Sequence, residues 1–410
     1  MKTRARSCGF FSFLILLLLP LFHASVSLST PRTKTIPGPA HERRALWVVR
    51  TTLTSPEKIE RMVSDAKKAN FNMLFVQVRG RGDAYYSSSI VPPPEDTNRP
   101  DFDPLSLVIS QAHKAGLEVH AWINVFLTWS KPTRPVSPDH AVNLHPEWFG
   151  AFPDGRSFVS ISREELGRRG IEGFFFSPGN PDVRQHIRTV VSEIVKKYAV
   201  DGIHLDYVRF PTLKSGFDEI SRREFMRVYY VDPLSLETEP EIVRNYYGAP
   251  GFEDLAGKWK SWQIECVTKV VREVGEEIRR ERPGIVFSAA VMPDIDASRD
   301  LHGQDWVSWV RNGYLDFVVP MCYSRSDEVV EQQLRRAVQS VGEARVMAGI
   351  AVYNQHSRGA VEKIRMARRQ GVLGVSLFSY DSVEKRTDYL HSLKRSVFQS
   401  PASIPNLRGN

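Results

Sequence analysis

The segment 201–211 combines the pattern of a buried strand with side chains that could do chemistry. Alternation along a strand places His204 and Asp206 on one face and Ile203 and Leu205 on the other. Burying an imidazole or a carboxylate is costly unless the group is paired or faces a cleft. We therefore expect this strand to end at a cleft, with Asp206 as the first candidate for a catalytic group.

The elements that would position Asp206 form a regular series. Near-continuous apolar runs of strand length alternate with amphipathic helix patterns, as is typical of parallel strands covered on both faces. The runs are 45–50, 73–79, 118–124, 202–210, 286–292, 317–323, 346–352 and 374–380. The series predicts an α/β fold, namely a single (β/α)8 TIM barrel. An open doubly wound sheet is the alternative, although such sheets usually have fewer strands.

Helix start signals lie between these runs. Ser55-Pro56, Asp103-Pro104 and Asn180-Pro181 each join a capping residue to a proline suited to the first helical position. A long helix is predicted near 259–281, and shorter ones near 304–311, 328–341, 358–370 and 383–394. The connections after the third and fourth strands, about 125–180 and 211–258, are too long for bare loops. We interpret them as long functional insertions.

Polar and aromatic side chains gather where the predicted strands end. In a TIM barrel these ends surround one pocket. The residues expected to bind substrate there are Arg79, His120, Trp122, Asn124, His204, Tyr207, Arg209, Tyr323, Tyr353 and Tyr380. Aromatic rings stack on the C–H faces of sugars, and amide or guanidinium groups bind sugar hydroxyls, so this set predicts a sugar-binding pocket.

Two carboxylates sit on neighbouring strands of the predicted barrel. Hydrolysis of a glycosidic bond needs two carboxyl groups, one to protonate the leaving oxygen and one to attack or to activate water. Asp206 and Asp294 are the predicted catalytic pair. Other interpretations stay open: Asp294 could cap the turn that follows it, and His204 could orient Asp206. The tyrosines could be core residues, and the arginines could neutralise inward carboxylates.

The first 28 residues have the order of a secretory signal peptide. Lys2, Arg4 and Arg6 precede an apolar run at 9–22, and small residues follow. The run is short for a membrane span, so we expect cleavage and no stable membrane insertion, with an uncleaved anchor as the alternative. The predicted organisation is a signal peptide (1–28), a Pro-rich linker (29–42), the barrel (43–395) and a flexible tail (396–410). The expected address is secreted or periplasmic.

Charge and composition narrow the possible partners. With 42% hydrophobic and 25% charged residues, the chain has an ordinary globular composition. Cleavage after residue 28 would remove three basic and no acidic residues, so the net charge would fall from +8 to +5. This mild basic excess is compatible with an acidic polymer and does not indicate nucleic acid.

No cofactor is predicted, because the chain has no His-x-His pair on its first strand and no Cys/His cluster. A metal-dependent hydrolase using His120, His204, Asp206 and Asp294 stays as an alternative.

Several blocks of the sequence resemble the glycosyl hydrolase-like family 10 proteins of bacteria. The blocks are 44–48, 70–79, 116–124, 177–184, 201–211 and 304–323, within a resemblance that spans about 43–390. The resemblance implies a TIM barrel and cleavage of glycans, and some relatives are similar to enzymes that cut peptide-free peptidoglycan strands. By analogy with retaining barrels, it implies that Asp206 is the nucleophile or charge stabiliser. Asp294 stands where many such barrels have a glutamate.

Taken together, these patterns predict a glycosidase that acts on a polysaccharide, with bacterial cell-wall glycan (peptidoglycan) as the expected substrate. A non-catalytic glycan-binding barrel is the alternative from another functional class.

Overall fold

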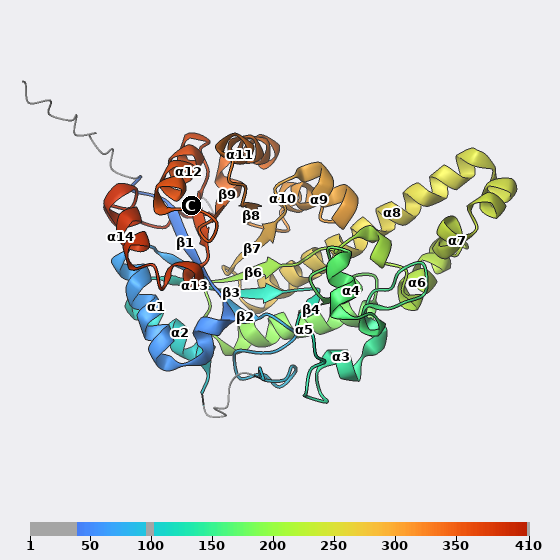
Figure 1. Cartoon of the computed structure of the whole chain (residues 1–410), viewed down its shortest axis with the longest axis horizontal. Coiled ribbons are helices and arrows are strands. Elements are labelled where there is room, and N and C mark those ends of the chain that lie inside the picture. Colours follow the sequence, from blue (N-terminus) through green and yellow to red (C-terminus); the bar gives the residue numbers. More distant parts are fainter. Residues whose placement is uncertain (1–38, 96–101, 408–410) are drawn as a thin grey trace, which may run out of the picture. The chain divides into compact units, whose positions relative to one another are not determined.

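A closed barrel of eight parallel strands forms the centre of the computed structural model, which describes residues 39–95 and 102–407 (Figure 1). The strands are β1 (Arg43–Val48), β2 (Met73–Arg79), β3 (Glu118–Asn124), β6 (Gly202–Asp206), β7 (Val286–Val291), β8 (Phe317–Cys322), β9 (Met347–Ala351) and β10 (Gly374–Phe378). They pair in chain order, and β1 closes the barrel by pairing with β10. The predicted TIM barrel is confirmed, and the open sheet is wrong because no barrel strand is left as an edge.

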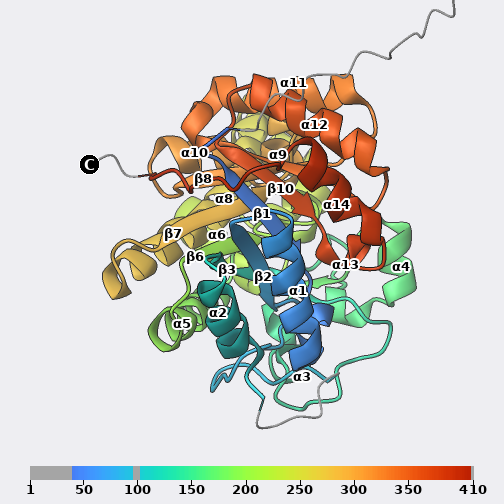
Figure 2. The same cartoon turned by 90° about the vertical axis from the view of Figure 1, so that its left-hand side faces the viewer.

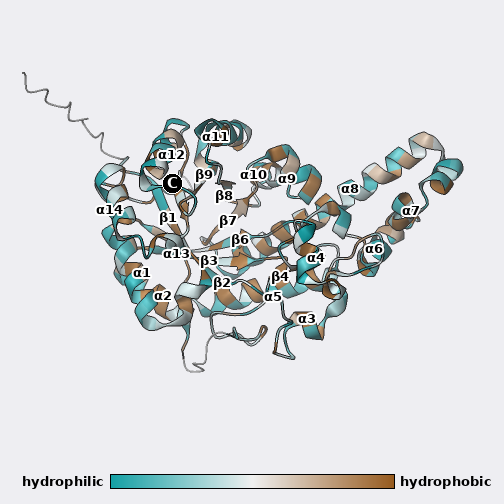
Figure 3. Cartoon of the chain, viewed as in Figure 1, coloured by the Kyte–Doolittle hydropathy of each residue, from teal (hydrophilic) through white to brown (hydrophobic). Residues whose placement is uncertain are grey.

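Helices cover the outside of the barrel, as Figure 2 shows from a second direction. They are α1 (Pro56–Lys68), α2 (Pro104–Lys114), α5 (Pro181–Lys197), α8 (Pro240–Glu281), α9 (Ile295–His302), α10 (Trp306–Arg311), α11 (Asp327–Val341), α12 (Ser357–Arg369), α13 (Tyr380–Val383) and α14 (Thr387–Ser396). The side chains of Ser55, Asp103 and Asn180 accept backbone N–H groups at the starts of α1, α2 and α5, which confirms these three helix starts. The outer surfaces of α11 and α12 carry the hydrophilic colour in Figure 3.

Side chains fill the barrel interior, so it is a packed core rather than a pore. Large apolar residues such as Trp47, Phe75 and Phe317 lie there, fully buried or nearly so. A separate and larger apolar layer lies between the strands and the helices. A ligand must therefore bind at an end of the barrel.

The two long connections carry secondary structure of their own. After β3 the chain forms a small antiparallel sheet of β4 (Leu127–Trp129) and β5 (Phe174–Phe175), with α3 (Ala141–Leu144) and α4 (Arg163–Arg168) between them. After β6 come α6 (Glu219–Tyr229), α7 (Pro233–Thr238) and the first half of α8. The helix predicted near 259–281 begins earlier, at Pro240, and is interrupted at Gly248, where φ is 74°.

Six of the barrel strands end earlier than predicted, and the changes at β6, β9 and β10 bear on predicted site residues. β6 ends at Asp206, because Tyr207 adopts a left-handed backbone conformation with φ of 49°. β9 ends at Ala351 and β10 at Phe378, so Tyr353 and Tyr380 lie beyond the strands.

The segment after α14 contacts the amino end of β1 through residues 400–403, within the stretch for which we predict a flexible tail. The Ser403 carbonyl accepts the Glu42 N–H at 3.1 Å, and the Ser400 carbonyl accepts Arg44 Nη1 at 2.7 Å. The predicted signal peptide lies outside the described residues. Among the helices that are described, none is both long and apolar enough to cross a membrane.

Candidate active site

A cavity of about 430 Å³ opens where the carboxyl ends of the barrel strands meet. Six of the predicted site residues line it: Trp122, Asn124, Asp206, Tyr207, Arg209 and Tyr323. Further walls come from the ends of β1, β2 and β10 and from the connection after β3. In Figure 1 this connection lies on the side toward which the arrows of β3 and β6 point.

Asp206 is the buried carboxylate of this cavity, with 8% of its surface exposed. Its Oδ1 accepts the Tyr207 N–H at 2.7 Å, and its Oδ2 accepts Trp122 Nε1–H at 3.1 Å. Burial raises the pKa of Asp206 to about 6, although the Tyr207 hydrogen bond and the charge of Arg209 lower it. Both N–H donors favour the charged form. Asp206 is thus an oriented carboxylate that is mostly ionised at neutral pH.

Glu172 is a second carboxylate at the cavity, and our sequence interpretation did not single it out. It lies in the connection after β3, just before β5, and its side chain is 43% exposed. Its Oε1 accepts Arg209 Nη2–H at 2.9 Å. Its negative charge contributes to the raised pKa of Asp206, so the two carboxylates interact electrostatically.

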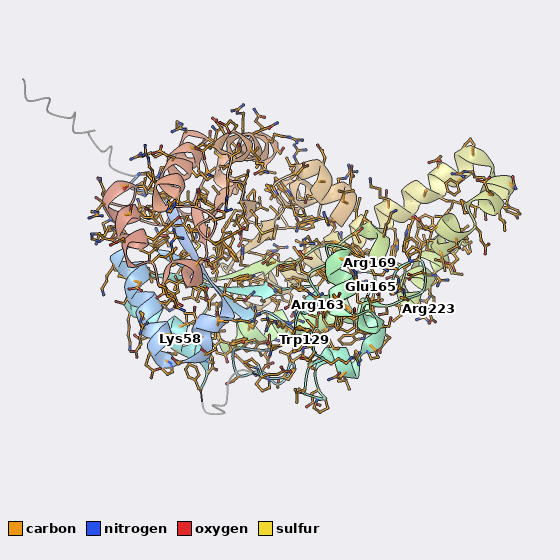
Figure 4. The ribbon with its side chains drawn as sticks, viewed as in Figure 1. Lys58, Trp129, Arg163, Glu165, Arg169 and Arg223 are labelled. Carbon is orange, nitrogen blue, oxygen red and sulfur yellow. The ribbon has the colours of Figure 1, made fainter. Side chains whose placement is uncertain are left out.

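Helix α4 holds the backbone at Glu172. Arg163, the first residue of α4, donates from Nη2 to the Glu172 carbonyl oxygen at 2.5 Å. Glu165 of the same helix and Arg169, which follows it, form an ion pair at 2.7 Å, and Figure 4 shows all three side chains at this corner of the insertion. The insertion therefore positions Glu172 through contacts that no local sequence pattern reveals.

A chain of hydrogen bonds crosses the ends of the first three strands. Arg50 Nη1 donates to Gln77 Oε1 at 2.8 Å, and Gln77 Nε2 donates to Asn124 Oδ1 at 3.3 Å. Asn124 Nδ2 in turn donates to the Gly80 carbonyl at 2.9 Å. A Cβ at position 80 would lie 2.7 Å from Arg50 Cδ, so glycine leaves the space that Arg50 occupies. These guanidinium and amide groups can bind sugar hydroxyls.

Aromatic rings form another wall of the cavity. The Trp47 ring meets the rings of Tyr323 and Phe378 edge-on, at 6.5 and 5.9 Å. Trp47 Nε1 donates to His204 Nε2 at 3.3 Å, and His204 Nδ1 lies 2.9 Å from Ser288 Oγ. Burial lowers the pKa of His204 well below its ordinary value. A neutral His204 therefore supports Trp47, and it does not line the cavity itself.

Four other predicted binding residues lie outside the cavity lining. His120 is fully buried in the barrel, with Nε2 3.2 Å from Glu118 Oε2. Arg79 is fully buried, donates to the Asn124 carbonyl and lies over the Phe176 ring. The remaining two are the tyrosines beyond the shortened strands. The Tyr380 hydroxyl donates to Asp65 Oδ2 at 2.9 Å, and Tyr353 is 53% exposed next to the cavity.

Asp294 is exposed and caps α9. Its Oδ1 accepts the N–H groups of Asp296 and Ala297 at 3.1 and 3.0 Å. It is not among the residues that line the cavity. The structure therefore brings Asp206 and Glu172 to one cavity and places Asp294 elsewhere.

The residues considered for a metal site do not form a ligand set. His120 contacts Glu118, His204 contacts Trp47 and Ser288, and Asp294 caps a helix. Within residues 39–95 and 102–407, no group of three or more His, Cys, Asp or Glu side chains could hold a metal ion.

Comparison with known proteins gives distant relatives that are named as glycosyl hydrolases. Glycosyl hydrolase YngK of Bacillus subtilis (strain 168) is 24% identical over 286 residues, which are 64% of this chain and 48% of the relative. Glycosyl hydrolase DigH of Escherichia coli (strain K12) is 25% identical over 280 residues, which are 63% of this chain and 55% of the relative. The chain thus spans about half the length of these curated relatives.

Among solved structures, the PgaB (BpsB) glycoside hydrolase domain from Bordetella bronchiseptica has a TM-score of 0.63. The match covers 88% of this chain and 100% of that chain at 13% identity, so it shows a shared fold. The profile of the family described as glycosyl hydrolase-like 10 matches residues 42–364, and this confirms the resemblance seen in the sequence blocks. Since the match covers most of its length, the chain belongs to the glycosyl hydrolase-like 10 family.

Proposed function

We propose that this protein hydrolyses O-glycosidic bonds of a polysaccharide in the cavity around Asp206. The observation that carries the proposal is a buried carboxylate whose two oxygens each accept an N–H donor at the mouth of the barrel. The aromatic rings and amides around it suit a sugar. Membership of the family supports glycan hydrolysis as the general chemistry.

Asp206 acts as the nucleophile or as the stabiliser of positive charge at the anomeric carbon. Both neighbouring N–H groups point at its oxygens and favour the ionised form, which is the form that these roles need. With its pKa raised to about 6, Asp206 is mostly ionised at neutral pH.

Glu172 supplies the second carboxyl group, in preference to Asp294. It is the other carboxyl group among the residues that line the cavity. In its protonated form it would protonate the leaving oxygen, and a water molecule would then complete hydrolysis at the anomeric carbon. Arg209 orients the Glu172 carboxylate before substrate binds.

The substrate we propose is bacterial cell-wall glycan, that is, peptidoglycan strands. The signal-peptide pattern of residues 1–28 supports a secreted or periplasmic address, where such a polymer would be met. The resemblance of the sequence blocks to proteins similar to peptidoglycan-strand hydrolases supports the same choice.

The test is incubation of the purified protein with intact peptidoglycan, with peptide-free strands and with a panel of other polysaccharides. Mass analysis of the released material should show fragments with new reducing ends from the wild type and none from Asp206→Asn. Equal release by this variant would contradict the role of Asp206. Binding without release from any polymer would favour the non-catalytic glycan-binding barrel.

A further inference from the structure

A second, larger cavity lies next to the active-site cavity, and aromatic rings that line the two cavities contact each other. Its volume is about 960 Å³, and it is lined by residues that follow β8 and β9 and by the first turns of α12. Tyr353 lines this second cavity. Its ring centroid lies 6.2 Å from those of Tyr323 and Phe378, and both of these residues line the active-site cavity. A polymer leaving the active site on this side would meet Tyr353 first.

The lining of this cavity, which we call the basic groove, has an excess of positive charge. Its charged residues are Arg325, Asp327, Arg358, Glu362, Lys363 and Arg386. Both acidic residues already have cationic partners. Asp327 Oδ1 lies 2.8 Å from Lys363 Nζ, and Glu362 Oε1 lies 2.8 Å from Arg365 Nη1. The arginines of the groove are therefore left to attract an anion.

Arg325 and Arg358 are the two cations that are available to a ligand. Both are exposed, and neither forms an ion pair with a carboxylate among the described residues. Arg386, by contrast, donates to the carbonyls of Val352 and Gln355 at 2.9 and 3.0 Å. Arg325 and Arg358 can thus turn toward a ligand without breaking an ion pair within the protein.

The walls of the basic groove are held in place by buried contacts. Lys363, with 2% of its surface exposed, donates to the Arg325 carbonyl at 3.1 Å and to Gln355 Oε1 at 3.0 Å. Asn354 Nδ2 donates to the Tyr323 carbonyl at 2.9 Å, which ties the groove to the active-site wall. In addition, His356 makes no side-chain cap at the start of α12, so the positive end of that helix also lines the groove.

We propose that the basic groove binds carboxylate-bearing sugar units of the polysaccharide that is cut beside Asp206. The proposal rests on the proposed function for the identity of the polymer, although binding in the groove does not need Asp206. Guanidinium groups bind carboxylates with two parallel hydrogen bonds, and an exposed tyrosine ring can stack on a sugar face. The carboxylate can belong to a hexuronic acid or to the lactyl ether of a muramic acid.

The experiment measures binding by calorimetry in the Asp206→Asn protein, which should not cleave the ligand. The ligands are oligosaccharides that contain hexuronic acid or muramic acid, each compared with the same compound after reduction of its carboxyl groups to alcohols. For one of the two kinds of oligosaccharide, hexuronic or muramic, we expect the carboxylated compound to bind at least about tenfold more tightly than its reduced form. Adding Arg325→Gln and Arg358→Gln together should abolish most of this preference.

Arg223→Gln with Arg299→Gln is the matched control, because it removes two positive charges at exposed sites that line neither cavity. Figure 4 labels Arg223 on α6. The control should keep the carboxylate preference. Tyr353→Ala is a second test that leaves the charge unchanged. It should weaken binding of carboxylated and reduced compounds alike, because it removes the stacking surface.

The outcomes separate this inference from the proposed function. The proposed role of the basic groove would be wrong if carboxylated and reduced oligosaccharides bound equally well. It would also be wrong if the control variant lost the carboxylate preference to the same extent. Either result would count even if the wild type cleaves glycans. A carboxylate preference that depends on Arg325 and Arg358 supports the groove even if no glycan is cleaved, and the proposed hydrolysis would then be wrong. The preferred carboxylate source identifies the sugar.

Discussion

Asp206 and Asp294 lie near the ends of two neighbouring barrel strands, but their surroundings differ. Asp206 is the last residue of β6, is buried, and accepts N–H groups from Tyr207 and Trp122. Asp294 stands three residues beyond Val291, the end of β7, where it is exposed and caps α9. A carboxylate within the strand points into the barrel mouth, whereas one just past it serves the next helix. For these two aspartates, the position relative to the strand end separates the cavity residue from the helix cap.

The same substitution at both positions gives the strongest test of this difference. Asp206→Asn should lower kcat/KM on the cleaved glycan by roughly 10³-fold, because it removes the ionised group at the anomeric carbon. Asp294→Asn should change kcat/KM by less than about threefold, since asparagine caps a helix as well as aspartate does. Initial rates of reducing-end release measure both. A comparable loss of kcat/KM in the two variants would show that Asp294 is a catalytic residue after all.

Glu172 extends the comparison to a carboxylate from an insertion. Glu172→Gln should lower kcat/KM on the natural glycan by about 100-fold, because the leaving oxygen loses its proton donor. The loss should be much smaller on an aryl glycoside whose leaving phenol is acidic. Glu164→Gln, an exposed change on α4, serves as the control. An equal loss on both substrates would show that Glu172 is not the acid.

The pH dependence of stability tests the buried surroundings of Asp206 as well. Burial raises the pKa of folded Asp206 to about 6, above its ordinary value of 3.8. The folded protein therefore binds the Asp206 proton more tightly than the unfolded chain does. The protonated carboxyl stabilises the folded state fully below the unfolded pKa, and this stabilisation is lost as the pH rises through about 6. Relative to Asp206→Asn, the wild type should lose about 2 kcal/mol of unfolding free energy between about pH 4 and about pH 8.

Urea unfolding of the two proteins at several pH values measures this difference. A difference between wild type and Asp206→Asn that stays constant with pH would mean that Asp206 titrates alike in the folded and unfolded protein.

The smallest expected effect is at the helix cap. Asp294→Ala should lower the unfolding free energy by about 1 kcal/mol, because two N–H groups of α9 lose their acceptor. Chemical unfolding at neutral pH measures it, and activity per folded molecule should stay unchanged. Full stability together with lost activity would reverse the assignment of Asp294.

The barrel and much of its mouth could be predicted from the sequence because they follow local rules. Trp122, Asn124 and Asp206 were predicted to gather where the strands end, and all three line the cavity. Glu172 could not be found this way, because it lies outside the regular elements. Its position depends on contacts with Arg163 and Arg209, which no local pattern predicts. The length of the connection after β3 was the one available signal.

The tyrosines after β9 and β10 show where alternation fails. Tyr380 was the last residue of a predicted strand and Tyr353 came directly after one, but β9 ends at Ala351 and β10 at Phe378. Beyond those ends, Tyr353 turns to the basic groove and Tyr380 packs beside α1 through its bond to Asp65. The point at which a strand ends is set by the tertiary structure and not by the apolar run alone.

The pH dependence of kcat/KM tests the central claim most directly, namely that Asp206 works as an ionised carboxylate in a buried barrel mouth. The wild type, kept below its unfolding range, should lose activity as the pH falls through about 6, with a tenfold loss for each further pH unit. Activity that stays constant down to about pH 4 would contradict the claim, because Asp206 would by then be protonated.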